Sequence, residues 1–272
     1  MPYRHAHWYL LALFPLVGLA FWPTYFAIFS TSSAALHAHA AVGTVWITIL
    51  AAQSWMIHHG QRDIHRQTGI ASLAIFPLFA AASAAVVVLM AQEFVSKSSP
   101  VSVTYGPRLG LGSVGLVMGF GYCYWQGLRR RRKVHPHSRY MLSTVIFLLP
   151  PIAVRLCRFI PLLAIQGPQD FWKLALNIQI ANIVVAAFAF ALAWRARKHG
   201  RPFVEAGAII LANDILLQSV GVLPAWERFF AHLGSVSLPV AALAGGVAGT
   251  IIAYSGWLAG KRSTPLVEMV PA

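Results

Sequence analysis

The sequence predicts an all-α fold, a polytopic transmembrane helix bundle in which residues 1–272 form a single integral membrane domain. Hydrophobic residues make up 58% of the chain and charged residues only 10%, whereas about 25% of the residues in a soluble domain are charged. Apolar stretches of about 20 residues, the length that crosses a bilayer as a helix, recur along the chain. Most of the 21 Lys and Arg lie in every second loop between these stretches, which is typical of polytopic membrane proteins.

The apolar stretches predict about eight membrane spans, with seven as the alternative count. They are residues 9–29, 36–58, 70–90, 109–128, 141–161, 174–194, 203–221 and 238–258. We interpret the first as a span rather than a cleavable signal, because its apolar run is long and lacks a small-residue cleavage pattern. The seventh is the most polar, and its Glu205 is expected to complement the N-terminus of that helix.

Prolines and glycines predict local features of three spans. Pro150 and Pro151 should kink the fifth span, because proline removes a backbone donor and clashes with the preceding turn. Gly115 and Gly245 each begin a GxxxG pattern, in the fourth and eighth spans, and this pattern lets helix backbones approach closely. These glycine-rich faces either pack within the chain or join a homo- or hetero-oligomer.

The basic residues assign an orientation to the spans. Basic loops follow spans two, four and six, and a basic segment follows span eight; together they contain Arg62, Arg66, the run 129–133, Arg139, Arg195, Arg197, Lys198, Arg201, Lys261 and Arg262. Because cytoplasmic loops hold the excess of Lys and Arg, both termini are predicted to be cytoplasmic, which favours eight spans over seven. The net charge of +14 therefore predicts contact with membrane lipids, through anionic headgroups at the cytoplasmic face, and no nucleic-acid partner.

Three histidine-containing segments lie near the ends of the predicted spans. They are LHAHAAVGTVW at 36–46, HRQTG at 65–69 and HPHSRYM at 135–141. Their pattern, with H-xxx-G-xx-W, HR-xx-G and H-x-R-x-M, resembles that of a group of uncharacterised bacterial multi-helix membrane proteins. The similarity covers residues 36–160 and implies a helix bundle in a bacterial cytoplasmic (inner) membrane, without implying an activity. The helix-end histidines also bear a faint likeness to those of transmembrane b-type cytochromes.

The likeness to b-type cytochromes makes haem the cofactor to consider. Bis-His haem requires paired histidines on facing helices. His39 and His58 are separated by about 28 Å at helical rise, so they lie at opposite interfaces. His58, His65 and His137 are the cofactor-binding candidates at the inner face; alternatively they bind headgroups or cap helices. We predict no metal site.

A second group of polar residues is predicted to converge in the outer half of the membrane. These ligand-pocket candidates are His39, Arg155, Arg158, Asn182, Asp214 and Gln218. An ionised carboxylate in hydrocarbon costs at least about 2.5 kcal/mol, so we expect Asp214 to pair with Arg155 or Arg158. Such a pair either fixes the helix register or lines an outward-facing pocket for a small anionic or quinone-like ligand.

Three functions remain open at this point, and the catalytic residues, if any, are unknown. The chain is a redox, cofactor-binding or quinone-binding membrane protein, a small-solute or ion transporter, or a non-catalytic membrane subunit. Nucleotide chemistry has no visible site, because the sequence contains no Walker loop and no Rossmann glycine signature. A retinal Schiff base is excluded by the lack of a mid-span lysine. Too few carboxylates lie in the spans for a four-Glu di-iron centre.

Overall fold

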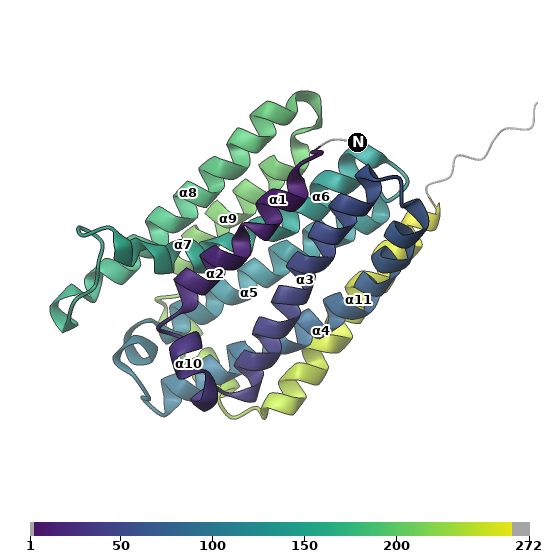
Figure 1. Cartoon of the computed structure of the whole chain (residues 1–272). Helices are drawn as coiled ribbons and strands as arrows, with labels where there is room; N and C mark the ends of the chain where they lie inside the picture. The colour runs from purple at the N-terminus through teal and green to yellow at the C-terminus, as the bar shows by residue number, and fades with distance from the viewer. Residues whose placement is uncertain (1–2, 263–272) are drawn as a thin grey trace, which may run out of the picture.

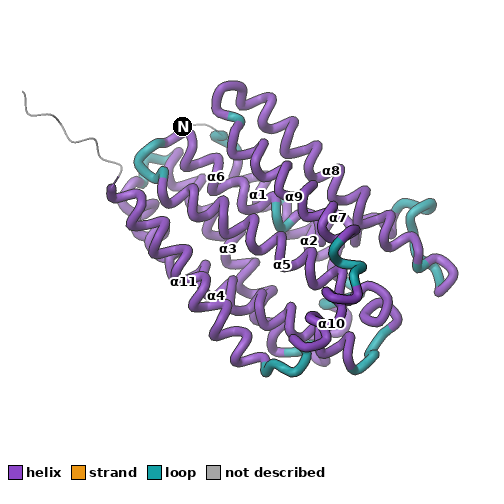
Figure 2. The backbone as a smooth tube through the Cα atoms, turned by 180° about the vertical axis from the view of Figure 1, so that it is seen from behind, coloured by secondary structure: helices purple, strands orange, loops and turns teal. Residues whose placement is uncertain are grey.

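The computed structural model describes residues 3–262, and every regular element within that range is a helix (Figure 1). The α-helices are α1 Ala6–Leu11, α2 Leu13–Phe21, α3 Ala34–His58, α4 Arg62–Val95, α5 Pro100–Arg129, α6 Val134–Ile146, α7 Leu149–Leu156, α8 Trp172–Ala196, α9 Arg201–Ser219, α10 Pro224–Leu233 and α11 Leu238–Arg262. Short 3₁₀ turns occur at Phe26–Thr31, Cys157–Phe159, Pro168–Asp170 and Arg197–His199. The long helices run alongside one another, with most loops gathered at the two ends (Figure 2).

Five helices are long and apolar enough to cross a membrane, and the number rises to six if α9 and α10 are counted as one bent span. The five are Ala34–His58, Arg62–Val95, Val134–Phe159, Lys173–His199 and Leu238–Lys261. The predicted all-α bundle with apolar spans is therefore confirmed, while the count of eight and the orientation of the termini stay predictions. Residues 9–21 of the first predicted span lie in the shorter apolar helix Ala6–Phe21, whereas residues 22–29 form a turn and part of the 3₁₀ turn Phe26–Thr31. The fourth predicted span falls in α5.

Helix breaks also occur within the fifth predicted span and just after the seventh. The fifth is broken between α6 and α7, just before the predicted kink at Pro150 and Pro151. The seventh ends with α9 at Ser219, and the chain then turns by 101° into α10. Helix α10 falls in a segment that was expected to be a loop, and its buried Phe230 packs at the opposite end of the bundle from the basic loops.

Helix α5 occupies the centre of the bundle (Figure 1), where it contacts α4, α6, α9, α10 and α11. Its sequence is rich in glycine and contains several tyrosines and serines. A helix that is surrounded by protein has little contact with lipid, so it does not need a continuous apolar surface. This position explains why α5 falls outside the set of strongly apolar helices although it is one of the longest.

Both GxxxG faces pack within the chain. At Gly115 of α5, an added Cβ would lie 1.8 Å from Oδ1 of Asn213 on α9. At Gly245 of α11, an added Cβ would lie 2.5 Å from the carbonyl oxygen of Ala80 on α4. At Gly245 the neighbouring backbone leaves no room for a side chain, whereas at Gly115 the space is filled by the Asn213 side chain. The formation of a homo- or hetero-oligomer stays a prediction.

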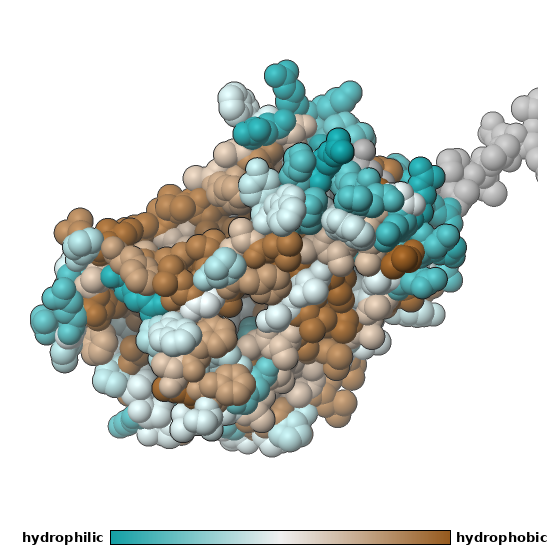
Figure 3. Space-filling model, viewed as in Figure 1, coloured by the Kyte–Doolittle hydropathy of each residue, from teal (hydrophilic) through white to brown (hydrophobic). Residues whose placement is uncertain are grey.

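The basic loops lie together at one end of the bundle, which we call the basic end. Three contacts between segments that are distant in the sequence show this. Arg131 Nη1 donates to the carbonyl oxygen of Trp257 at 2.8 Å, and the His135 and His199 rings stack with centroids 4.5 Å apart. Arg139 Nε donates to the Tyr3 hydroxyl at 3.1 Å, which adds the N-terminal segment. Figure 3 shows hydrophilic residues concentrated at this end and brown apolar surface along the helices.

We predict that Gly245→Ala destabilises the protein by about 1–3 kcal/mol, because the added methyl group meets the backbone of Ala80, which cannot move aside. The matched control is Gly246→Ala, whose added Cβ has its nearest contact at 3.6 Å and should be neutral or slightly stabilising. Thermal unfolding of the purified protein in detergent measures both. Equal melting temperatures for the two variants would contradict the close approach of α11 and α4.

Candidate functional site

The two arginines of the predicted outer pocket contact α2 instead of α9. The Arg155 guanidinium lies 4.2 Å from the centroid of the Phe21 ring. Arg158 Nη2 donates to the carbonyl oxygen of Ala20 at 2.9 Å. The last carbonyls of a helix have no partner within it, so a guanidinium that reaches the end of α2 satisfies a group that would otherwise be buried unpaired.

Asp214 finds its partner on α8. Asn182 Nδ2 donates to Asp214 Oδ1 at 2.8 Å. Within residues 3–262, the side-chain ion pairs are Lys173–Asp170 and Arg201–Glu205. The expected ion pair of Asp214 with Arg155 or Arg158 is therefore wrong, because α7 packs against α2 and α8 and directs its arginines toward α2.

The remaining outer candidates lie apart from this pair. His39 Nδ1 is 3.3 Å from Ser83 Oγ, and its ring packs on Phe79, so it contacts α4. Gln218 lies one turn beyond Asp214 on α9, and its buried Nε2 has no hydrogen-bond partner among the described residues. Of the six candidates, the structure thus brings Asn182 and Asp214 into contact, with Gln218 nearby on the same helix.

The three inner histidines are each held through Nδ1 by a backbone carbonyl. The distances are 2.7 Å for His58 to Ser54, 3.3 Å for His65 to Gln53 and 2.8 Å for His137 to Gly127. In a neutral imidazole that donates through Nδ1, Nε2 is left as the acceptor. The residues described contain no group of three or more His, Cys, Asp or Glu that could hold a metal ion. Haem binding by these histidines stays a prediction.

Glu205 forms the hub of a polar network near the basic end. Its Oε1 accepts a hydrogen bond from Arg201 Nε at 2.6 Å, and its Oε2 accepts from the hydroxyls of Tyr140 at 2.7 Å and Tyr122 at 3.0 Å. Glu205 was expected to complement the N-terminus of α9, but it lies in the second turn and bonds side chains of α5 and α6. The tyrosines belong to other helices, so no pattern in the sequence points to this network.

The network continues along α5 to the protein surface. Gln126 Nε2 donates to the Tyr122 hydroxyl at 2.8 Å, and Gln126 Oε1 accepts from Arg130 Nη1. The Arg130 guanidinium also lies over the ring of Tyr140, 4.9 Å from its centroid. Arg130 is therefore shared between the Glu205 network and the surface of the basic end.

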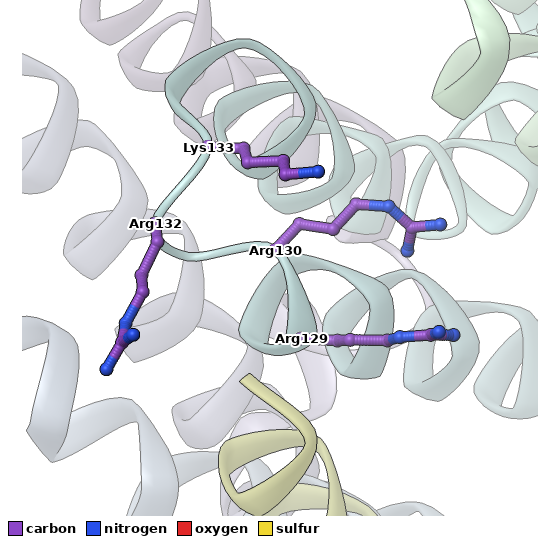
Figure 4. Close-up of a pocket in the computed structure, with 4 residues that line it drawn as sticks. All are labelled: Arg129, Arg130, Arg132 and Lys133. Carbon is purple, nitrogen blue, oxygen red and sulfur yellow. The ribbon is translucent and has the colours of Figure 1, made fainter. Parts of the chain in front are cut away.

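A shallow pocket of about 220 Å³ opens beside Arg130, where α5 ends and α6 begins. It is lined by Arg129, Arg130, Arg132 and Lys133. Arg129, Arg130 and Lys133 extend toward the same side, whereas Arg132 points away from them (Figure 4). Burial and the charge of the adjacent Arg132 lower the pKa of Arg131, as expected where cations crowd together.

Within residues 3–262, Arg129, Arg130 and Lys133 form no ion pair with a carboxylate. The Arg129 guanidinium lies instead over the Trp125 ring, 5.3 Å from its centroid. A second, more open depression of about 660 Å³ at the same end is lined by Ala193, Trp194, Arg195 and Arg197. A cluster of cations on one surface produces a positive potential that attracts anions. The basic end is therefore the strongest candidate binding surface in the structure.

Comparison with known proteins identifies no family for this chain. No protein-family model, no curated protein and no solved structure matches the chain. The function proposed for the chain therefore rests on its own contacts, burial and charge.

We predict that Asn182 and Asp214 are energetically coupled and that Arg155 and Asp214 are not. A double-mutant cycle with Asn182→Ala and Asp214→Ala should give about 0.6 kcal/mol of coupling, the average for hydrogen bonds between membrane helices. The cycle with Arg155→Ala and Asp214→Ala should be additive within about 0.5 kcal/mol. Equilibrium unfolding in mixed micelles measures both, and a larger coupling for the arginine cycle would contradict the observed pairing.

Proposed function

We propose that this chain is an eight-pass integral protein of a bacterial cytoplasmic membrane, and that its basic end lies in the cytoplasm and binds a phosphate-bearing anion. The ligand chemistry is that of a phosphate ester, supplied either by an anionic lipid headgroup or by a soluble phosphate. The observation that carries the proposal is that Arg129, Arg130 and Lys133 extend toward the same side of the pocket and that these three form no ion pair with a carboxylate of residues 3–262.

The path of the chain supports the eight passes and the orientation. The helices α1 and α2 lead away from the basic end, α3 returns to it, and the later helices continue this alternation (Figure 1). An even number of passes returns the chain to the end of the bundle at which it began. This explains why contacts join the N-terminal segment, the two loops at His135 and His199, and the end of α11. Cytoplasmic loops carry the excess of Lys and Arg, so the basic end is assigned to the cytoplasm.

The chemistry of the pocket supports a phosphate ligand. Arginine presents several N–H donors in a planar fork that matches phosphate oxygens, and lysine adds a compact positive charge. Arg129 and Lys133 are exposed at the end of a membrane helix, which is the level of lipid headgroups. A redox or transport function centred on an outer pocket receives less support, because the arginines expected there contact α2.

We predict that the two ends of the bundle differ in their access to a membrane-impermeant maleimide. Ser98→Cys, in the exposed turn between α4 and α5, should be labelled in intact cells. Lys133→Cys should be labelled only after permeabilisation, because the basic end faces the cytoplasm. The parent protein is the control, since Cys123 and Cys157 are buried. Labelling of Lys133→Cys in intact cells would refute the orientation.

We predict that Arg129→Gln with Lys133→Gln weakens binding of phosphatidylglycerol by about 25-fold, since each basic residue near a membrane surface contributes about 1 kcal/mol. Native mass spectrometry of the protein in neutral detergent measures the affinity, with phosphatidylcholine as the zwitterionic reference. The matched control is Arg62→Gln with Arg66→Gln, which removes the same charge from exposed positions of α4.

The same variants separate the two phosphate sources. Binding of inorganic phosphate that is lost only in the Arg129–Lys133 variant would assign the pocket to a soluble ligand, whereas selective loss of phosphatidylglycerol would assign it to lipid. An equal loss in the control variant would reduce the pocket to a general charge effect and overturn the proposed function.

A further inference from the structure

A continuous chain of hydrogen bonds leads from Glu205 on α9 to Arg130, which lines the pocket that is proposed to bind phosphate. We call this chain the relay; it consists of Glu205, Tyr122, Gln126 and Arg130. Its three middle and outer members lie on α5 with a spacing of four residues, so they follow one another along a single face of that helix. The relay therefore connects the proposed binding surface to the interior of the bundle.

The direction of each hydrogen bond in the relay is set by Glu205. This residue pairs with Arg201, so it is an ionised carboxylate, which accepts hydrogen bonds and donates none. The Tyr122 hydroxyl must then donate its hydrogen to Glu205, and its oxygen is left to accept from Gln126 Nε2. The amide oxygen of Gln126 consequently points the other way and accepts from Arg130 Nη1. The carboxylate thus determines which end of the Gln126 amide faces the pocket.

Burial makes this orientation of Gln126 hard to reverse. The residue is 6% exposed, so little water can replace the partners of its amide. A reversed amide would direct its NH₂ group at the guanidinium of Arg130, and two groups that only donate would face each other unpaired. The guanidinium is supported from a second direction by the buried ring of Tyr140, 4.9 Å from its centroid. The position of Arg130 is therefore determined by buried groups of the protein.

One edge of the Arg130 guanidinium remains available to a ligand. Gln126 engages Nη1, whereas Nε and Nη2 form no hydrogen bond within residues 3–262. The side chain extends toward the same side as Arg129 and Lys133 (Figure 4). Two N–H groups on one edge of a guanidinium match two oxygens of a phosphate group. A guanidinium that is already fixed loses less conformational freedom when the ligand arrives, which favours binding.

From these contacts we propose that Tyr122 and Gln126 are positioning residues of the pocket, and that Arg130, held by the relay, binds two phosphate oxygens through Nε and Nη2. The inference rests on the proposed function, because it concerns how the same pocket recognises its ligand. Arg129 and Lys133 contribute positive charge at the surface, whereas the relay contributes a fixed geometry. Affinity for the phosphate group therefore depends on buried neutral residues as well as on the exposed cations.

Two probes test the proposal on the purified protein in neutral detergent: phosphatidylglycerol by native mass spectrometry and ³²P-labelled inorganic phosphate by equilibrium dialysis. For each probe that the parent protein binds, Tyr122→Phe should weaken binding about fivefold, which corresponds to the loss of about one hydrogen bond. The matched control is Tyr105→Phe, which removes a buried hydroxyl that lies on the same helix and donates to the Phe171 carbonyl oxygen. This control should leave the affinity unchanged.

Tyr140→Phe tests whether the path through Gln126 matters. It removes a second hydroxyl from the same oxygen of Glu205 but keeps the ring beneath Arg130, so its loss of affinity should be smaller than that of Tyr122→Phe. Gln126→Met, which replaces the amide with an unbranched apolar side chain, should weaken binding at least as much as Tyr122→Phe. Melting temperatures of the variants establish that each one is folded.

The Arg130→Met background provides a readout that a merely structural role of Tyr122 would not give. If Tyr122 acts through Arg130, Tyr122→Phe should cause no further loss of affinity in that background, whereas independent effects would add. Equal losses in the two backgrounds, or equal losses in Tyr122→Phe and Tyr140→Phe, would overturn the relay and leave phosphate binding by the pocket intact. Failure of the parent protein to bind either probe would instead overturn the proposed function, and the relay's role with it.

Discussion

The close approach of helix backbones at glycine positions is the constraint on which the rest of this bundle depends. Helix α11 packs against α4 at Gly245, where even a methyl group would meet backbone atoms. At Gly115 the central helix α5 instead receives the Asn213 side chain of α9. Lipid provides no hydrophobic force that drives helices together, so van der Waals contact at small residues is a principal source of association. The glycines thereby place α5 in the centre and the more apolar helices around it.

Tight packing of this kind determines what each polar side chain can reach. Within the bundle there is little water, so donors and acceptors are satisfied by groups on neighbouring helices. Arg158 bonds the end of α2, Glu205 bonds two tyrosines, and Asp214 bonds Asn182. In each case the partner is the polar group that the neighbouring helix presents at the same depth. Within residues 3–262, a few buried side-chain atoms are left without a partner, among them His58 Nε2, Ser143 Oγ and Gln218 Nε2.

Polar groups at the basic end and between α8 and α9 are satisfied in different ways. Cations of several loops lie together at the basic end, and Arg130 connects its pocket to the Glu205 network through Gln126. An exposed pocket of this kind suits an anion at headgroup level. Between α8 and α9, the Asp214 carboxylate is instead hydrogen-bonded by the amide of Asn182.

The sequence by itself determined the helical class, the position of the long apolar helices, the break near Pro150, the close approach at the GxxxG patterns and the separation of basic from neutral loops. These features depend on local composition and spacing, which the chain carries wherever it folds. Only the tertiary structure decided that Arg155 and Arg158 contact α2, that Asp214 pairs with Asn182 and that Glu205 bonds Tyr122 and Tyr140. Those partners depend on which helices are neighbours and how each is rotated about its axis, and residues at equal depth can lie on opposite sides of a bundle.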